Sequence, residues 1–171
     1  MDELFALGLS SVGLEDYTRA DAALGELRKS IGASRDRDSR ELSSIMAGEL
    51  SALLAIARGR RDEGLALLSA AAAREASRPK PIARPYPPKP AGELYAEALL
   101  GLGQPAAAVV QYRRVLERTP RRPLAVLGLA RASAAAGQRV DARRAAGEFL
   151  AIWHAADSDR PELAEARALA K

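Results

Sequence analysis

A set of mostly small residues recurs at a constant interval in the C-terminal half of the chain. The identities are Ala91, Ala96, Ala98, Gly103, Gln104, Ala108 and Leu116, repeated with a period of 34 as Ala125, Ala130, Ala132, Gly137, Gln138, Ala142 and Leu150. Two antiparallel helices need small side chains where they approach most closely and a glycine where the chain reverses. The spacing therefore predicts two copies of a helix-turn-helix unit, with turns at Gly103 and Gly137.

The pattern continues toward the N-terminus with a longer spacing. Ala52, Gly59 and Gly64 lie 44 residues before Ala96, Gly103 and Ala108. The ten extra residues fall in the segment 78–90, RPKPIARPYPPKP, which contains six prolines and cannot continue a helix. A fourth and weaker unit is expected to turn at Gly13.

The composition agrees with an all-helical chain. Ala (38) and Leu (24) exceed a third of the 171 residues, whereas aromatic residues are only 4%, which disfavours a β-sandwich or barrel. We expect helices over 2–12, 15–31, 39–58, 61–77, 90–102, 105–118, 122–136, 139–155 and 160–170. Asp38 with Glu41, and Asp159 with Glu162, are predicted capping boxes.

The chain has no Cys and one His, so disulfides and Cys/His zinc sites are excluded, and we expect neither a metal nor another cofactor.

The residues Ala96, Gly103, Ala108, Tyr112 and Pro120, followed by Ala130, Gly137, Ala142 and Phe149, resemble tetratricopeptide repeats. More narrowly, the region from Lys89 onward is similar to the C-terminal part of bacterial repeat proteins of uncharacterised function. The resemblance implies an all-α, right-handed α-solenoid and a role in scaffolding or peptide binding rather than catalysis. In one solenoid domain, 1–77 would form degenerate hairpins, 78–90 a proline-rich insertion, 91–158 two repeats and 159–171 a capping helix.

In such a solenoid the first helix of each unit lines a concave groove. The repeat positions then predict a partner-binding groove, for a protein or peptide, formed by Glu49, Leu53, Ile56, Glu93, Glu97, Leu100, Leu127 and Arg131, with Met46 and Ala134 beside them. Because Arg131 occupies the position in the second repeat that Glu97 occupies in the first, we expect an ion pair between them across the groove floor. Glu93 and Glu97 share a helix face at a spacing of four, which leaves a carboxylate-based hydrolase as an alternative.

Arginine is concentrated in the second half of the chain. Nine Arg lie between Arg113 and Arg144, against only Glu117 and Asp141. The alternative function is therefore an adaptor with a basic surface that docks an acidic partner or nucleic acid, formed by Arg113, Arg114, Arg121, Arg122, Arg143 and Arg144. Nucleic acid is the less favoured partner, because Tyr112 is nearly the only aromatic residue among these cations.

The proline-rich segment has two interpretations. A PxxP motif at Pro85–Pro88 beside Arg84 and Lys89 is typical of SH3 ligands. The same composition suits a stiff spacer with Ile82 and Tyr86 packed against the solenoid, and we favour this second interpretation.

No apolar run approaches the ~20 residues of a membrane span, so no membrane insertion is expected. A cytoplasmic location is the default expectation, and a missing upstream signal segment would make it periplasmic or secreted.

Overall fold

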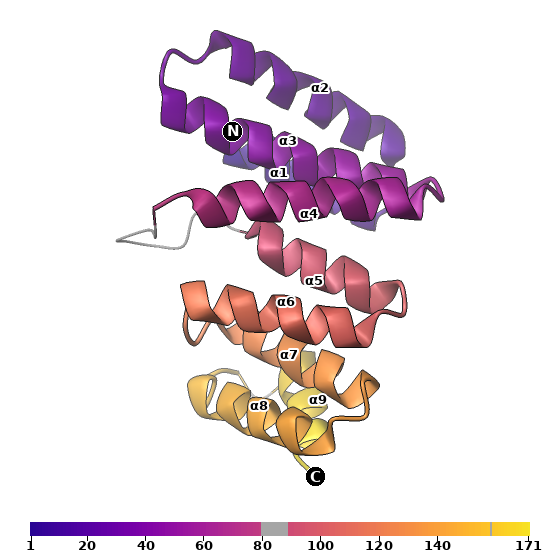
Figure 1. Ribbon diagram of the computed structural model, residues 1–171, viewed down its shortest axis with the longest axis vertical. Helices are drawn as coiled ribbons and strands as arrows, with labels where there is room; N and C mark the ends of the chain where they lie inside the picture. The colour runs from indigo at the N-terminus through magenta and orange to yellow at the C-terminus, as the bar shows by residue number, and fades with distance from the viewer. Residues whose placement is uncertain (80–88, 158) are drawn as a thin grey trace. The chain divides into compact units, whose positions relative to one another are not determined.

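The computed structural model describes residues 1–79, 89–157 and 159–171, and these residues contain helices and no strands. The helices are α1 (Asp2–Gly13), α2 (Tyr17–Ala33), α3 (Arg37–Ala57), α4 (Arg61–Ser77), α5 (Ala91–Gly101), α6 (Pro105–Arg118), α7 (Pro123–Ala135), α8 (Arg139–Ile152) and α9 (Pro161–Leu169) (Figure 1). The predicted all-α class is confirmed, and each helix lies within a few residues of its predicted range. The chain divides into two compact units, Met1–Tyr95 and Ala96–Lys171, so that the boundary falls within α5.

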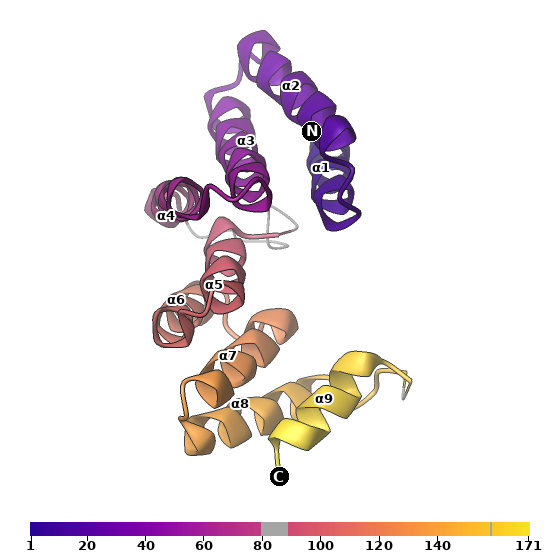
Figure 2. The same cartoon turned by 90° about the vertical axis from the view of Figure 1, so that its right-hand side faces the viewer.

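The first unit is built around α3, which packs against α1, α2 and α4. Figure 2 shows α3 between α2 and α4. Ile45 of α3 packs with Ala71 and Ala72 of α4 and with Ala91 of α5, and Tyr95 covers this cluster. On another side of α3, Leu50 lies so close to Gly8 of α1 that a Cβ atom there would overlap it. Small residues thus allow the close helix contacts that the sequence predicts.

The second unit packs α7 against α6, α8 and α9. Val126 and Leu127 of α7 meet Phe149 of α8 and Leu163 of α9 in one cluster, with Trp153 against it. The rings of Phe149 and Trp153 are 4.8 Å apart. The last helix therefore covers the apolar faces of α7 and α8, and Trp153 packs against the same cluster.

The four hairpins share one type of turn. Gly59, Gly103 and Gly137 have φ of 81°, 76° and 75°, and Glu15 has φ of 60°. The amide of the residue after each one donates to a carbonyl five residues earlier, as in Asp16 N to Ser11 O (2.9 Å) and Gln104 N to Leu99 O (2.8 Å). The first turn therefore centres on Glu15 and not on the predicted Gly13, which lies within α1. The turn residues 15, 59 and 103 follow one another at intervals of 44 residues, whereas 103 and 137 are 34 residues apart. The longer spacing found in the sequence therefore also separates the first hairpin from the second.

The predicted helix caps differ from the observed ones. At the start of α3 the side chain of Asp36, rather than that of Asp38, accepts from Ser39 N at 2.7 Å, because the helix begins two residues earlier than expected. Hydrogen bonding by Ser39, first through its side chain and then through its amide, lowers the pKa of Asp36. Helix α9 begins after Arg160 with no side-chain cap, so Asp159 does not fill that role, and Pro161 stands in its first turn, where its missing N–H leaves no hydrogen bond unmade.

Candidate binding groove

An open hollow of about 550 Å³ lies in the first unit, where α2 and α4 form the walls and α3 forms the floor. The floor carries Ser44, Ala47, Gly48 and Ser51 of α3. Their spacing of i, i+3, i+4 and i+7 places all four on one face of the helix. Because a Cβ built on Gly48 meets only the Ala71 Cβ, at 3.9 Å, the floor has room above it.

Larger apolar side chains form the walls of this hollow, which we call the α2–α4 groove. Leu24 and Ile31 come from α2, and Leu67 comes from α4. The α3 residues that line the groove run from Ser44 to Leu54, which is a rise of about 15 Å or nearly three turns. The groove therefore has the length and the narrow, small-residue floor that a short helical segment needs for close approach.

Charged residues lie at one end of the α2–α4 groove and across its middle. Arg58 pairs with Asp21, and Arg60 Nε lies 3.2 Å from Glu63 Oε2. Arg28 donates to Ser51 Oγ at 3.0 Å, and the structure pairs it with no carboxylate among the residues that it describes. Arg28 is therefore the cation in the groove that is positioned to meet a carboxylate from outside.

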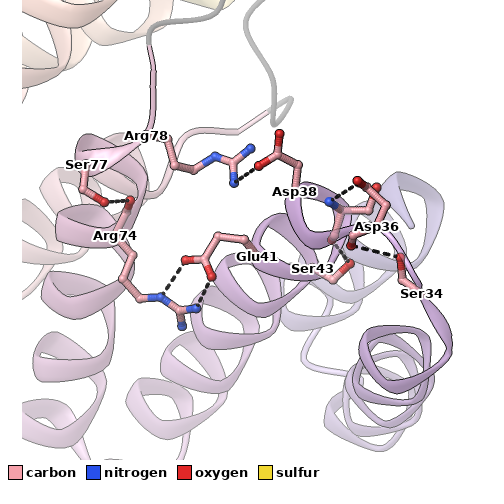
Figure 3. Close-up of polar contacts among 9 residues, drawn as sticks. Ser34, Asp36, Asp38, Glu41, Ser43, Arg74, Ser77 and Arg78 are labelled. Carbon is pink, nitrogen blue, oxygen red and sulfur yellow. Dashed lines mark hydrogen bonds and ion pairs between the residues drawn. The ribbon is translucent and has the colours of Figure 1, made fainter.

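The other end of the groove is held by contacts between α3 and α4. Arg74 donates through Nε and Nη2 to the two carboxylate oxygens of Glu41, at 3.0 and 2.9 Å, and through Nη1 to Ser44 Oγ at 3.1 Å. Figure 3 shows this pair, with Arg78 directed toward Asp38 nearby. The hydrogen bond from Arg74 lowers the pKa of Glu41. These contacts fix Ser44, the first residue of the floor, relative to α4.

The residues predicted for the concave groove differ from one another in their exposure to solvent. Met46, Glu49, Glu93 and Leu127 are fully buried, so their side chains belong to the interior and not to an open surface. Ile56 is partly buried because it lies against Gly64 of α4, within the hairpin. Leu53, Leu100, Ala134 and Arg131 are partly exposed, and Glu97 is exposed. The α2–α4 groove uses another face of α3, which the repeat positions did not indicate.

Arg131 takes a partner that was not predicted. Its Nε and Nη2 donate to the two carboxylate oxygens of Glu165 on α9, at 2.7 and 2.5 Å. This hydrogen-bonded pair raises the pKa of Arg131 and lowers that of Glu165, and Glu97 adds only a weaker electrostatic attraction. Glu165 follows Arg131 at the same interval by which Arg131 follows Glu97, so the repeat spacing pointed equally to both carboxylates. The two-pronged geometry matches a planar guanidinium to a planar carboxylate.

The carboxylates considered for a hydrolase lie in different environments. Glu93 is fully buried with Lys89 Nζ 3.2 Å from its Oε1, whereas Glu97 is exposed. An acid and base pair would need both groups in one pocket beside a substrate. This arrangement gives the hydrolase alternative no support.

The predicted basic surface is divided by an acidic residue. Arg113 of α6 and Arg144 of α8 both pair with Asp141, at 2.9 and 2.8 Å. Arg114, Arg121 and Arg143 are exposed, and Arg122 is partly buried. Two of the six predicted cations are thus partly neutralised within the unit.

Several other predictions concern segments or ligands. The PxxP motif at Pro85–Pro88, with Ile82, Arg84 and Tyr86, lies outside the described residues. Within the described ranges, no helix is both long and apolar enough to cross a bilayer, and no three His, Asp or Glu side chains are grouped so that they could hold a metal ion.

Comparison of the chain with protein-family models, with curated proteins and with solved structures found no match.

Proposed function

We propose that this chain is a non-catalytic interaction protein that binds a short helical segment of a protein partner in the α2–α4 groove. The observation that carries the proposal is the 550 Å³ hollow with a floor of Ser44, Ala47, Gly48 and Ser51. Small floor residues let a second helix approach closely, and the flanking Leu24, Ile31 and Leu67 supply apolar contacts along its sides.

The expected partner has a defined chemistry. Its apolar residues would recur at i, i+3, i+4 and i+7 over about three turns, to match the floor. One carboxylate would lie at the middle of that stripe, opposite Arg28, which has a hydroxyl partner in Ser51 but no carboxylate among the described residues. A segment with both features would pair with the groove in register.

The finer architecture is also a proposal. We infer that the hairpins are tetratricopeptide-like and form a right-handed α-solenoid. Support comes from the shared geometry of the turns at Glu15, Gly59, Gly103 and Gly137. The interval between the last two turns equals the length of a tetratricopeptide unit, which is about 34 residues.

The groove is tested with a library of helical peptides displayed on phage and selected against the full chain. We expect enriched peptides that carry the apolar spacing and an acidic residue, and that lose most of their binding to a Gly48→Leu variant. The matched control is Gly147→Leu on α8, an exposed glycine with open space around it, which should bind as well as the wild type. Enriched peptides that bind Gly48→Leu equally well, or no enrichment at all, would contradict the proposal.

The basic adaptor is the weaker candidate. Binding by such a basic surface would lose most of its affinity between low and physiological salt concentration, because exposed charges are screened over about 8–10 Å. This salt dependence would distinguish it from binding in the groove. The sharing of Asp141 by Arg113 and Arg144 reduces the charge that this surface offers.

A further inference from the structure

Two buried carboxyl groups lie in the interior of the first unit. Glu49 of α3 has no exposed surface, and neither of its carboxylate oxygens has a hydrogen-bond partner among the described residues. Glu93, in the first turn of α5, is also fully buried. A buried charge without partners is costly, so a group placed like Glu49 favours its uncharged form.

The neighbouring charges connect Glu49 to the start of α5. Glu75 of α4 accepts a hydrogen bond from Gly92 N in the first turn of α5, at 3.3 Å. Lys89, just before α5, places its Nζ 3.2 Å from Glu93 Oε1. Glu75 and Lys89 are also the charged groups that act on Glu49, with opposite signs, and among the described residues neither α1 nor α2 supplies another.

Protonation of Glu49 changes the balance of this cluster. With its proton bound, Glu49 adds no charge beside Glu75 and Lys89. With Glu49 ionised, its new charge attracts Lys89 and repels Glu75, the group that holds the Gly92 amide.

The burial of Glu49, and secondarily the charge of Glu75, raise the pKa of Glu49 well above its ordinary value, whereas Lys89 opposes the shift. The pKa of Glu49 in the folded state therefore lies above its pKa in the unfolded state, which is about 4.3. A raised carboxyl pKa contributes stability that is fully present below the unfolded pKa and is lost as the pH rises through the folded value.

We propose that Glu49, Glu75, Lys89 and Glu93 form a proton-controlled latch, which holds the first turn of α5 against α3 and α4 while Glu49 is protonated and releases it when the proton leaves to solvent. Ala91 and Tyr95 are the apolar parts of this contact, because they pack on Ile45 of α3 and on Ala71 and Ala72 of α4.

The latch is tested by hydrogen exchange of the full chain between about pH 5 and pH 9, with mass spectrometry of peptides that cover residues 91–95. After correction for the intrinsic rate, we expect their protection to fall about tenfold for each pH unit between the unfolded pKa of Glu49, near 4.3, and its raised folded pKa, and to stay level above the folded pKa. In a Glu49→Gln variant, which copies the uncharged form, the protection should stay level over the same range. A Glu165→Gln variant in the second unit is the control and should keep the wild-type response of this segment.

Equal pH dependence in the wild type and in Glu49→Gln, or level protection in both, would overturn the proposal. A second measurement does not depend on folding of the variant. In carbon NMR of the wild-type chain, the Glu49 carboxyl should titrate well above the ordinary glutamate value of about 4.3, and a titration at that ordinary value would also overturn the proposal.

Discussion

The two units use the same hairpin turn but place their carboxylates in opposite environments. In the second unit, Glu165 meets Arg131 in a two-pronged hydrogen-bonded pair at the surface of α7 and α9. In the first unit, Glu49 is buried with no hydrogen-bond partner among the described residues. The two units therefore share the backbone geometry of their turns. The side chains packed around each carboxylate differ, and they determine how the stability of each unit depends on pH and on substitutions.

The largest difference between the units is expected from two glycine substitutions. A Cβ on Gly128 would overlap the buried ring of Tyr112, whereas a Cβ on Gly8 would overlap the end of the Leu50 side chain, which can rotate away. We expect Gly128→Ala to lower the free energy of unfolding of the second unit by about 2–3 kcal/mol, and Gly8→Ala to lower that of the first by about 1 kcal/mol.

Chemical denaturation measures both effects. Fluorescence of Trp153, the single tryptophan, reports on the second unit, and circular dichroism reports on both. Gly147→Ala is the control, since nothing lies near its added Cβ, and it should raise stability by about 0.5–1 kcal/mol through helix propensity. A Gly128→Ala variant as stable as this control would contradict the described packing of Tyr112.

A smaller effect is expected from the surface pair of the second unit. The side chains of Arg131 and Glu165 are 41% and 38% exposed, so solvent screens them, and we expect Arg131→Ala to cost only about 1 kcal/mol. The lowered pKa of Glu165 makes this stability present above the unfolded pKa and lost as the pH falls through the folded value.

Denaturation followed by Trp153 fluorescence at pH 7 and at about pH 3 tests this prediction. The difference between the wild type and Arg131→Ala should shrink in acid, and Arg143→Ala, at an exposed position, should cost less at both pH values. A difference that grows in acid would contradict the pairing with Glu165.

The smallest effect compares two turns. Glu15 adopts the left-handed conformation that Gly59 adopts at the corresponding point of the next hairpin. A side chain in this conformation costs about 1 kcal/mol, so Glu15→Gly should raise the free energy of unfolding by about 0.5–1 kcal/mol, and Gly59→Ala should lower it by a similar amount. Thermal unfolding followed by circular dichroism measures both changes, and a loss of stability in Glu15→Gly would contradict the shared turn.

Local signals in the sequence predicted most of the helix ends. Gly59, Gly103 and Gly137 placed the starts of α4, α6 and α8 at the observed Arg61, Pro105 and Arg139. The first turn was misplaced because Glu15 carries no glycine signal, and its role is visible only in the backbone geometry.

The site was harder to predict because burial depends on residues far apart in the chain. The spacing that paired Arg131 with Glu97 also reaches Glu165, and only the packing of α9 on α7 decides between them. Glu49 is buried by helices that the repeat pattern could not place around it. The small residues Ser44, Ala47, Gly48 and Ser51 were a readable signal for the α2–α4 groove, but a small face is equally compatible with a packed helix.

Photocrosslinking in the α2–α4 groove tests most directly whether a helical peptide binds there. Benzoylphenylalanine is placed at Ser51 on the floor or at Gly147 on α8, and the full chain is irradiated with a peptide selected from the helical library. If the peptide binds in the groove, crosslinks form from position 51 to the apolar stripe of the peptide and none form from position 147. Equal crosslinking from both positions, or crosslinking from position 147 alone, would show that the groove is not the binding site.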